Sequence, residues 1–365
     1  MRTLAEACTP AAAGEDFLLG AYDFTVPEQA IAQWPARPRD SARLMCLDRR
    51  TGATSHHLVP ALAELLVPGD LLVVNATGVL PARLRVLRPN GGGAELLFVR
   101  PVDGPVEQAR RWRALARPAR ALAVGSALAL CGREGDRGLA LQVVAREGAM
   151  VEVVGGGPLW DLMRSHGEVP LPPYISRPQG PSRQDAADYQ TPFAREPGAA
   201  AAPTASLHFT PALLRALDRR GVSRAEIVLH VGPGTFLPVR ADADGDVRGH
   251  SMHAEAYQVG DAACDAVAAV RRRGGRVVAV GTTALRALET WAATGERSGW
   301  SRLFVLPGHR FRVVDALVTN FHLPKSTLVM LVAALAGRRP TLAAYREALA
   351  HSYRFFSFGD AMLVA

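Results

Sequence analysis

Residues 318–337 bring together several groups that could bind or transform a polar substrate. Asn320 and His322 precede a proline, and a Lys-Ser-Thr sequence then opens an apolar helix. Free N–H groups at a helix N-terminus attract anions, so this arrangement indicates a site for a carboxylate or a phosphate. Lys325 is the only lysine among the 42 basic residues, and its compact ammonium differs from a planar guanidinium. The alternative is that Lys325 merely caps a core helix.

Two further histidines and a glutamate form the pattern H-x-x-H-x-E at residues 250–255. At the entry to a strand, His253 and Glu255 would point to the same face, which gives an imidazole–carboxylate pair suited to proton transfer near neutral pH. A metal site is the alternative. We expect no metal, because the pattern lacks the i,i+4 spacing of histidines in helical zinc sites.

A Gly-Thr-Thr turn at residues 281–283 joins an expected strand, 276–280, to a helix that carries Arg286 and Glu289. Glycine and hydroxyl groups at such a turn are typical of a cradle for an anion or a hydroxyl group. Simple helix capping, with an Arg286–Glu289 pair one turn apart, explains the same residues equally well.

Two other histidines lie beside expected element ends. His230 closes a strand that runs into Gly232 and Gly234, and these glycines would let the backbone approach a ligand closely, although a plain tight turn explains them as well. His208 stands just before a threonine and a proline that mark the start of a helix at 211–220.

Two parts of the chain differ in the elements that would position these groups. Over 71–154, short apolar runs are separated by Gly, Pro and Asn turns about every 8–12 residues, which is typical of a small β-barrel or sandwich. From residue 189 onwards, strands and helices alternate, which indicates an α/β domain with its site at the carboxyl ends of the strands. We expect a discontinuous α/β domain over 1–70 and 155–365, with 71–154 inserted as an all-β domain.

The expected elements of the α/β part can be placed individually. The helices are expected at 58–66, 211–220, 261–273, 283–293, 326–336 and 341–350, and the strands at 226–230, 276–280, 303–306 and 316–318. The Pro-rich stretch 169–188 is expected to be an ordered crossing segment without regular structure.

Composition limits the class of protein. The 365 residues are 48% hydrophobic and can bury a large core. The net charge of +8 favours an anionic partner such as RNA, although a general preference for arginine explains part of the excess; arginines gather at 110–120 and 271–276. The four cysteines have no C-x-x-C spacing, so we expect free thiols. The N-terminal segment has no apolar h-region and no apolar run is long enough to span a membrane, so we expect a cytoplasmic protein without membrane contact.

The order of the motifs is similar to that of one known family. The S-adenosylmethionine:tRNA ribosyltransferase-isomerase family resembles this chain in the blocks YQTPFA, AAPTASLHFT, LHVGPGTFLPV, HSMHAE, GTTALRALE, DALVTNFHLPKSTL and YRFFSFGDAML. The blocks YDFTVPEQAIAQWPARPRDSARL, PGDLLVVN, LPARL and VPLPPYI extend the resemblance over residues 20–365. The resemblance implies an α/β fold with an inserted β-barrel, S-adenosylmethionine as co-substrate without a metal, and tRNA as partner.

The reaction that the resemblance implies belongs to queuosine biosynthesis. The ribosyl part of S-adenosylmethionine is transferred to the aminomethyl group of a 7-deazaguanine in tRNA and rearranged to an epoxycyclopentanediol, with release of adenine and methionine. Such chemistry needs a base, an acid, and polar groups that hold the ribose and the methionine. The catalytic candidates are His208, His230, His253, Glu255 and His322. The substrate-binding candidates are Asn75, Arg83, Tyr189, Gln190, Thr191, Thr204, Gly232, Gly234, Thr235, Thr282, Thr283, Arg286, Asn320, Lys325, Ser326, Thr327, Arg354 and Asp360.

The chain departs from the family pattern at three positions. Ala76 and Gly78 stand where relatives usually have aspartate and arginine, and Ser206 stands where they usually have glycine. These losses suggest a changed acceptor site, so a paralogue that uses the same sulfonium chemistry on a small molecule, or that only cleaves S-adenosylmethionine, is the alternative. A tRNA-binding module without catalysis is a third possibility. The identity of the base and the oligomeric state are left open.

Overall fold

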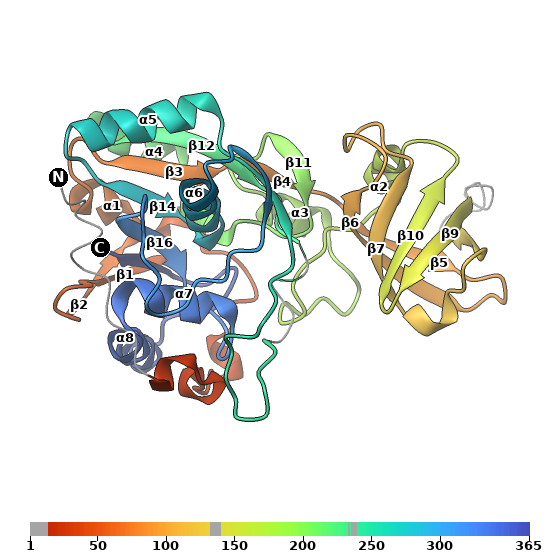
Figure 1. Ribbon diagram of the computed structural model, residues 1–365, viewed down its shortest axis with the longest axis horizontal. Coiled ribbons are helices and arrows are strands. Elements are labelled where there is room, and N and C mark those ends of the chain that lie inside the picture. Colours follow the sequence, from red (N-terminus) through yellow and green to blue (C-terminus); the bar gives the residue numbers. More distant parts are fainter. Residues whose placement is uncertain (1–13, 132–139, 233, 235–238) are drawn as a thin grey trace.

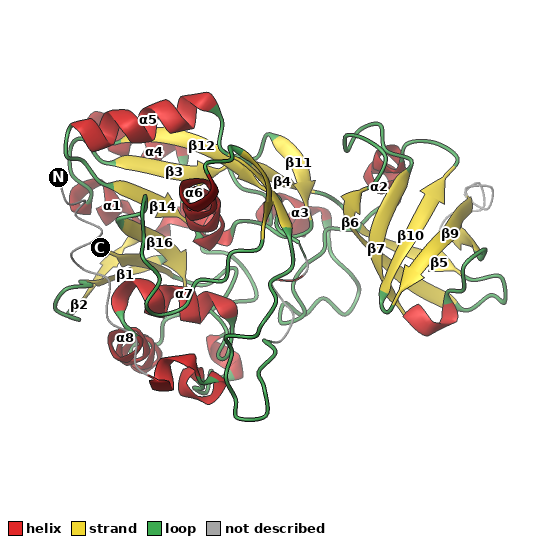
Figure 2. Cartoon of the chain, in the orientation of Figure 1, coloured by secondary structure: helices red, strands yellow, loops and turns green. Residues whose placement is uncertain are grey.

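The computed structural model describes residues 14–131, 140–232, 234 and 239–365, and it combines a large mixed sheet, flanked by helices, with a closed β-barrel (Figures 1 and 2). This arrangement confirms the expected fold class. The strands are β1 Arg43–Leu47, β2 Thr54–Leu58, β3 Leu71–Asn75, β4 Thr77–Val79, β5 Arg83–Leu87, β6 Gly93–Pro101, β7 Arg111–Arg117, β8 Ala127–Leu130, β9 Ala140–Glu147, β10 Met150–Gly155, β11 Glu196–Ala199, β12 Ser223–Leu229, β13 Glu255–Gln258, β14 Val277–Val280, β15 Ser298–Ser301, β16 Ala316–Asn320 and β17 Ala361–Val364. The α-helices are α1 Leu62–Leu65, α2 Leu159–His166, α3 Arg183–Asp188, α4 Pro211–Arg219, α5 Asp261–Arg272, α6 Thr282–Thr294, α7 Thr327–Ala336 and α8 Arg338–Ala350.

The large sheet has the strand order β15-β13-β12-β3-β14-β16-β17-β1-β2. Its four central neighbours, β12, β3, β14 and β16, run parallel, so their carboxyl ends meet at one edge. Strand β17 is antiparallel to β16 and parallel to β1, which joins two distant parts of the chain. The polar loops that follow β12, β14 and β16 are thereby brought together.

Two hydrophobic cores lie on the two faces of this sheet. Along β3, Leu71 and Val73 belong to the core that includes residues of helices α5 to α8, whereas Leu72 and Val74 belong to the core that includes residues of α1 and α4. A strand that is buried on both faces needs an unbroken apolar sequence, as parallel strands covered by helices usually have.

The barrel closes in the order β10-β7-β6-β5-β8-β9 and lies at one end of the molecule (Figure 1). Its hydrophobic core contains residues from Leu80 to Met163, the latter on α2. The expected boundaries of the inserted domain, 71 and 154, therefore need correction at both ends. Strand β3 belongs to the large sheet, as its continuous apolar sequence indicates, and α2 packs on the barrel.

Three expectations about single elements were wrong. The segment 303–306 is not a strand, because the carbonyl oxygen of Leu303 accepts a hydrogen bond from the Arg286 side chain instead of from a neighbouring strand. The nearest strand is β15, which lies just before this segment. The stretch 169–188 contains helix α3, which Ser182 starts with a capping box formed with Asp185. The helix expected at 58–66 is reduced to α1, because Val59–Ala61 forms a 3₁₀ turn and β2 ends at Leu58.

In the described part of the chain, no single helix has both the length and the apolar content needed to cross a bilayer. Helices α7 and α8 meet these limits only when they are joined, and they are bent by 115° relative to each other.

Candidate active site

A pocket opens where the parallel strands β14 and β16 end. Gly281 follows β14 and Asn320 closes β16, in agreement with the usual position of ligand sites in α/β sheets. Its lining combines aromatic and apolar side chains with a few hydroxyl and amide groups, as is typical of a site for a small molecule. Seven of the predicted residues line it: Tyr189, Thr204, Thr282, Thr283, Asn320, His322 and Ser326.

Asn320 is held in place by two partners from the segment before α4. The Thr204 hydroxyl donates to Asn320 Oδ1 (2.9 Å), and Asn320 Nδ2 donates to His208 Nε2 (3.2 Å). Burial lowers the pKa of His208 to about 4, which leaves its imidazole neutral, and the ring also bonds the backbone of Arg39. His208 does not line the pocket, so it acts on the pocket by positioning Asn320.

His322 is the histidine that lines this pocket among the described residues. Its Nε2 lies 2.7 Å from the Thr319 hydroxyl, and its backbone N–H donates to Tyr345 Oη (3.2 Å). Burial lowers its pKa to about 3, so the imidazole is unprotonated at neutral pH. Ser326 lies nearby, and its hydroxyl accepts from Val329 N (3.3 Å) as the N-cap of α7.

The N-terminus of α6 faces the same pocket. Gly281 has a positive φ of 86° and no side chain caps the helix, so the expectation of simple capping by the two threonines was wrong. The Thr283 hydroxyl instead accepts from Asn75 Nδ2 (3.2 Å). Asn75 also links β3 to β12 through two hydrogen bonds with the backbone of Leu229. It therefore holds the lining residue Thr283 in a fixed position relative to these two strands.

A second cavity lies between the end of β12 and the barrel, and His230, Gly232 and Glu255 line it. The His230 Nδ1 lies 2.8 Å from the Thr77 hydroxyl, and burial lowers the pKa of the ring. A Cβ at Gly198 would lie 2.5 Å from this ring, so glycine is needed there for close contact. Val231, between His230 and Gly232, lines the first pocket, so the two cavities lie on opposite sides of this strand end.

The expected His253–Glu255 pair was wrong. The buried carboxylate of Glu255 forms an ion pair with the buried guanidinium of Arg286 and accepts from Gly232 N (2.9 Å). Strand β13 starts at Glu255, whereas His253 lies in the loop before it and packs against Gly234. The two side chains therefore have different surroundings.

The alternative Arg286–Glu289 pair is also absent. Arg286 turns to Glu255 and to the carbonyl oxygen of Leu303 (3.1 Å). Glu289 accepts three backbone N–H groups of residues 312–314 at 2.9 Å each, and its pKa is held low by these hydrogen bonds and by His309 despite burial. The two charges of α6 thus have separate partners, Glu255 of β13 for Arg286 and the backbone of residues 312–314 for Glu289.

A groove next to the second cavity is lined by several arginines. His253, Gly232 and Gly234 line it together with four arginines: Arg100, Arg113, Arg240 and Arg302. Within the arginine cluster at 110–120, only Arg113 reaches this groove among the described residues, since Arg111 pairs with Glu152 and Arg110 bonds the carbonyl oxygen of Gly156.

Lys325 and several other predicted binding residues do not line the first pocket. Lys325 Nζ forms an ion pair with Asp23 at 2.6 Å, and both side chains are about half exposed. Asp360 is buried and binds Arg43 and Arg354. The predicted Thr235 lies outside the described residues.

Four more predicted residues lie outside the lining of the first pocket: Arg83, Gln190, Thr191 and Thr327. Gln190 bonds both backbone groups of Val79 (3.0 and 3.3 Å), and Arg83 lies 3.5 Å from Glu95. Thr191 is buried, and Thr327 begins α7 without lining the pocket.

The lining residues that the sequence analysis missed include four with aromatic or hydroxyl side chains: Tyr174, Thr319, Phe356 and Ser357. Three of them lie in the matching blocks VPLPPYI and YRFFSFGDAML. Aromatic residues in such blocks are a usable signal, because binding sites combine apolar surface with a few polar groups.

The comparisons with known proteins agree with this arrangement. The sequence model of the family described as "Queuosine biosynthesis protein" matches residues 19–364. The S-adenosylmethionine:tRNA ribosyltransferase-isomerase of Anaeromyxobacter dehalogenans (strain 2CP-C) is 50% identical over 95% of this chain and 99% of its own length. The protein of that name from Citrifermentans bemidjiense is 46% identical over the same shares.

A solved structure is also similar. The crystal structure of the S-adenosylmethionine tRNA ribosyltransferase from Thermotoga maritima shares 36% identity and a TM-score of 0.53, and the match covers 94% of this chain and 100% of that one. These matches confirm the resemblance found in the motifs. This chain belongs to the family of queuosine biosynthesis proteins.

Proposed function

We propose that this chain transfers the ribosyl group of S-adenosylmethionine to 7-aminomethyl-7-deazaguanine in tRNA and isomerises it to the epoxycyclopentanediol of epoxyqueuosine. Adenine and methionine are released. The observation that carries the proposal is the convergence of matched blocks from distant parts of the chain, at Tyr189, Thr204, Thr282 and Asn320, on one pocket. The names of the relatives support the same substrates.

The composition of the first pocket supports S-adenosylmethionine as its ligand. Tyr174, Tyr189 and Phe356 offer aromatic surface for adenine. The hydroxyl of Thr204 and the amide of Asn320 offer hydrogen bonds of the kind that hold ribose hydroxyls. The uncapped N-terminus of α6 suits the methionine carboxylate, because its free N–H groups and dipole favour an anion.

His322 is the imidazole that lines the first pocket among the described residues. The reaction needs a base that removes a proton next to the sulfonium and an acid that assists the departure of adenine. Burial keeps the ring neutral at neutral pH, so it does not repel the sulfonium, but a pKa of about 3 makes it a weak base. We therefore assign His322 to contact with the substrate, and the roles of base and acid to other groups.

The basic groove supports tRNA as the acceptor. It lies beside the second cavity, shares Gly232 with it and carries His253 and four arginines. Guanidinium groups attract and hold phosphates. A cytoplasmic location is part of the same proposal.

The small-molecule alternative rested on Ala76 and Gly78. Thr77, between them, keeps its contact with His230, and Ala76 is buried with its backbone N–H bonded to Ile227. These contacts do not depend on the two lost charges, so they do not favour a different acceptor.

Adenine release with and without tRNA that carries the aminomethyl-deazaguanine tests the proposal. Release should require the tRNA and should continue in the presence of EDTA. Asn320→Ala, which removes the partner of Thr204 and His208, should lower kcat/KM for S-adenosylmethionine about ten- to a hundred-fold. Asn90→Ala, in a barrel hairpin, is the matched control. Equal adenine release without tRNA would support simple cleavage instead.

A further inference from the structure

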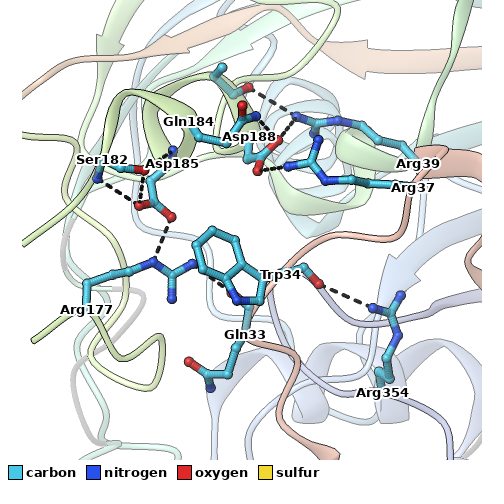
Figure 3. Close-up of polar contacts among 11 residues, drawn as sticks. Gln33, Trp34, Arg37, Arg39, Arg177, Ser182, Gln184, Asp185, Asp188 and Arg354 are labelled. Carbon is cyan, nitrogen blue, oxygen red and sulfur yellow. Dashed lines mark hydrogen bonds and ion pairs between the residues drawn. The ribbon is translucent and has the colours of Figure 1, made fainter.

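An exposed tryptophan lies outside the two cavities and the groove. Trp34 is 49% exposed, although tryptophan is usually largely covered. The guanidinium carbon of Arg177 lies 3.6 Å from the ring centroid, so one face of the indole is stacked against an arginine (Figure 3). The exposed remainder of the ring is an aromatic surface open to a ligand.

Two arginines contact this tryptophan, since Arg177 stacks on its ring and Arg354 donates to its carbonyl oxygen, and both belong to a cluster held by buried carboxylates. Asp185, Asp188 and Asp360 are at most 3% exposed. The cluster comprises these three aspartates and five arginines that pair with them: Arg37, Arg39, Arg43, Arg177 and Arg354. Five guanidinium groups against three carboxylates leave a net positive charge, and the side chain of Arg37 is 60% exposed. The surface therefore presents fixed cations next to an aromatic ring.

Two segments connect this surface directly to the first pocket. The Gln33 amide donates to the carbonyl oxygen of Tyr174 (2.9 Å). The Arg354 guanidinium donates to the carbonyl oxygen of Trp34 (3.3 Å) (Figure 3). Tyr174 lines the pocket, and so does Ser357, three residues after Arg354. A polymer whose reacting unit enters the pocket would therefore have its neighbouring units close to Trp34.

We propose that Trp34 stacks an unpaired base of the tRNA next to the nucleotide that reacts, while Arg37 and Arg354 contact the adjoining phosphates. This inference rests on the proposed function. A base that reacts in a pocket must leave its stack, which exposes the faces of its neighbours. Proteins that recognise RNA take up such bases on aromatic rings and arginine planes, and they hold the backbone with basic side chains.

Binding of a labelled RNA hairpin with the loop of an anticodon arm, measured by fluorescence anisotropy over a range of salt, tests the inference. Trp34→Ala should weaken binding about ten- to a hundred-fold without changing the salt dependence. Trp34→Phe should keep most of the affinity. Arg37→Gln should reduce the slope of log K against log salt by about 0.7, as expected for one lost phosphate contact to a single strand.

Trp160→Ala is the matched control, because Trp160 on α2 also lies against an arginine, Arg164, at 5.8 Å. It should bind the hairpin as the unchanged chain does. S-adenosylmethionine affinity, measured by calorimetry, should be unaltered in the Trp34 variants; a parallel loss would mean that the substitution damages the pocket, and this would overturn the inference.

The outcomes separate the inference from the proposed function. If the unchanged chain modifies tRNA and Trp34→Ala binds the hairpin equally well, the stacking surface is refuted and the function stands. If the unchanged chain binds no hairpin and tRNA does not stimulate adenine release, both the stacking surface and the proposed function are refuted. A fully paired RNA duplex should bind both forms equally, and a loss of duplex binding by Trp34→Ala would also contradict stacking of an unpaired base.

Discussion

The buried ion pair between Glu255 and Arg286 allows a sharp test of how the site is built. The side chains are 4% and 5% exposed, and the pair links β13 to α6. Glu255 also holds the backbone of Gly232, which lines the second cavity and the groove. The perturbation is Arg286→Met, which keeps an apolar chain but removes the charge and leaves the carboxylate buried.

The expected losses in the free energy of unfolding follow from the contacts of each charged group. Arg286→Met should lower the free energy of unfolding by about 3–5 kcal/mol, because it leaves one buried charge without its partner. Glu255→Gln alone should also cost about 3–5 kcal/mol, since it leaves the buried guanidinium of Arg286 without a charged partner. In the Arg286→Met background the same Glu255→Gln change should raise stability by about 2 kcal/mol, because the amide can still accept from Gly232 and carries no charge.

Urea unfolding of the four proteins, with unchanged m-values, measures this reversal of sign. The exposed pair of Arg297 and Asp261, with side chains 60% and 77% exposed, is the matched control. Arg297→Met should cost at most about 1 kcal/mol. If Glu255→Gln destabilises the chain equally in both backgrounds, the two groups are not coupled and the description of this buried pair is wrong.

Burial lowers the pKa of His208 to about 4 and that of His322 to about 3. Both lie below the unfolded value of about 6.5, so the unfolded chain binds more protons and stability should fall as the pH drops from about 6.5 towards 4, by up to ~1.4 kcal/mol per pH unit for each ring. His322→Gln should flatten this fall in urea unfolding; an unaltered profile would contradict the assignment. Ser206 Oγ is buried without a partner among the described residues, so Ser206→Ala should raise the free energy of unfolding by about 1 kcal/mol, and a loss of stability would show that the hydroxyl is satisfied. Lys325→Arg should leave kcat/KM for S-adenosylmethionine within about twofold, because the half-exposed pair with Asp23 contributes little; a tenfold drop in the steady-state assay would restore the role of Lys325 in substrate binding.

Local sequence patterns predicted much of the architecture. Alternating apolar residues and turn signals located the barrel strands, and Thr210 with Pro211 located the start of α4. Local patterns could not predict which strands pair when the two strands are distant in sequence. Strand β1 pairs with β17 through Leu44 and Ala361, and no local signal specifies that contact. The boundary error at residue 71 had a visible cause, since a sequence without alternation is typical of a strand buried on both faces.

The site was predicted less completely than the fold. Glycine and hydroxyl residues after strand ends identified the pocket, because the ends of parallel strands share one edge. The partner of Glu255 could not be predicted, since Arg286 belongs to another element and meets it only in the folded chain. The isolated lysine was a compositional signal, and in the structure Lys325 pairs with Asp23. Composition does not reveal which way a side chain points.

The central claim is that S-adenosylmethionine and tRNA react together on this chain, and the most direct measurement is product analysis by mass spectrometry. The chain is incubated with S-adenosylmethionine and with tRNA that carries 7-aminomethyl-7-deazaguanine, and the digested nucleosides are analysed together with the small molecules. We predict that the deazaguanine nucleoside is converted to epoxyqueuosine, with adenine and methionine released in equal amounts. Adenine and methionine formed while the tRNA stays unmodified would contradict the account.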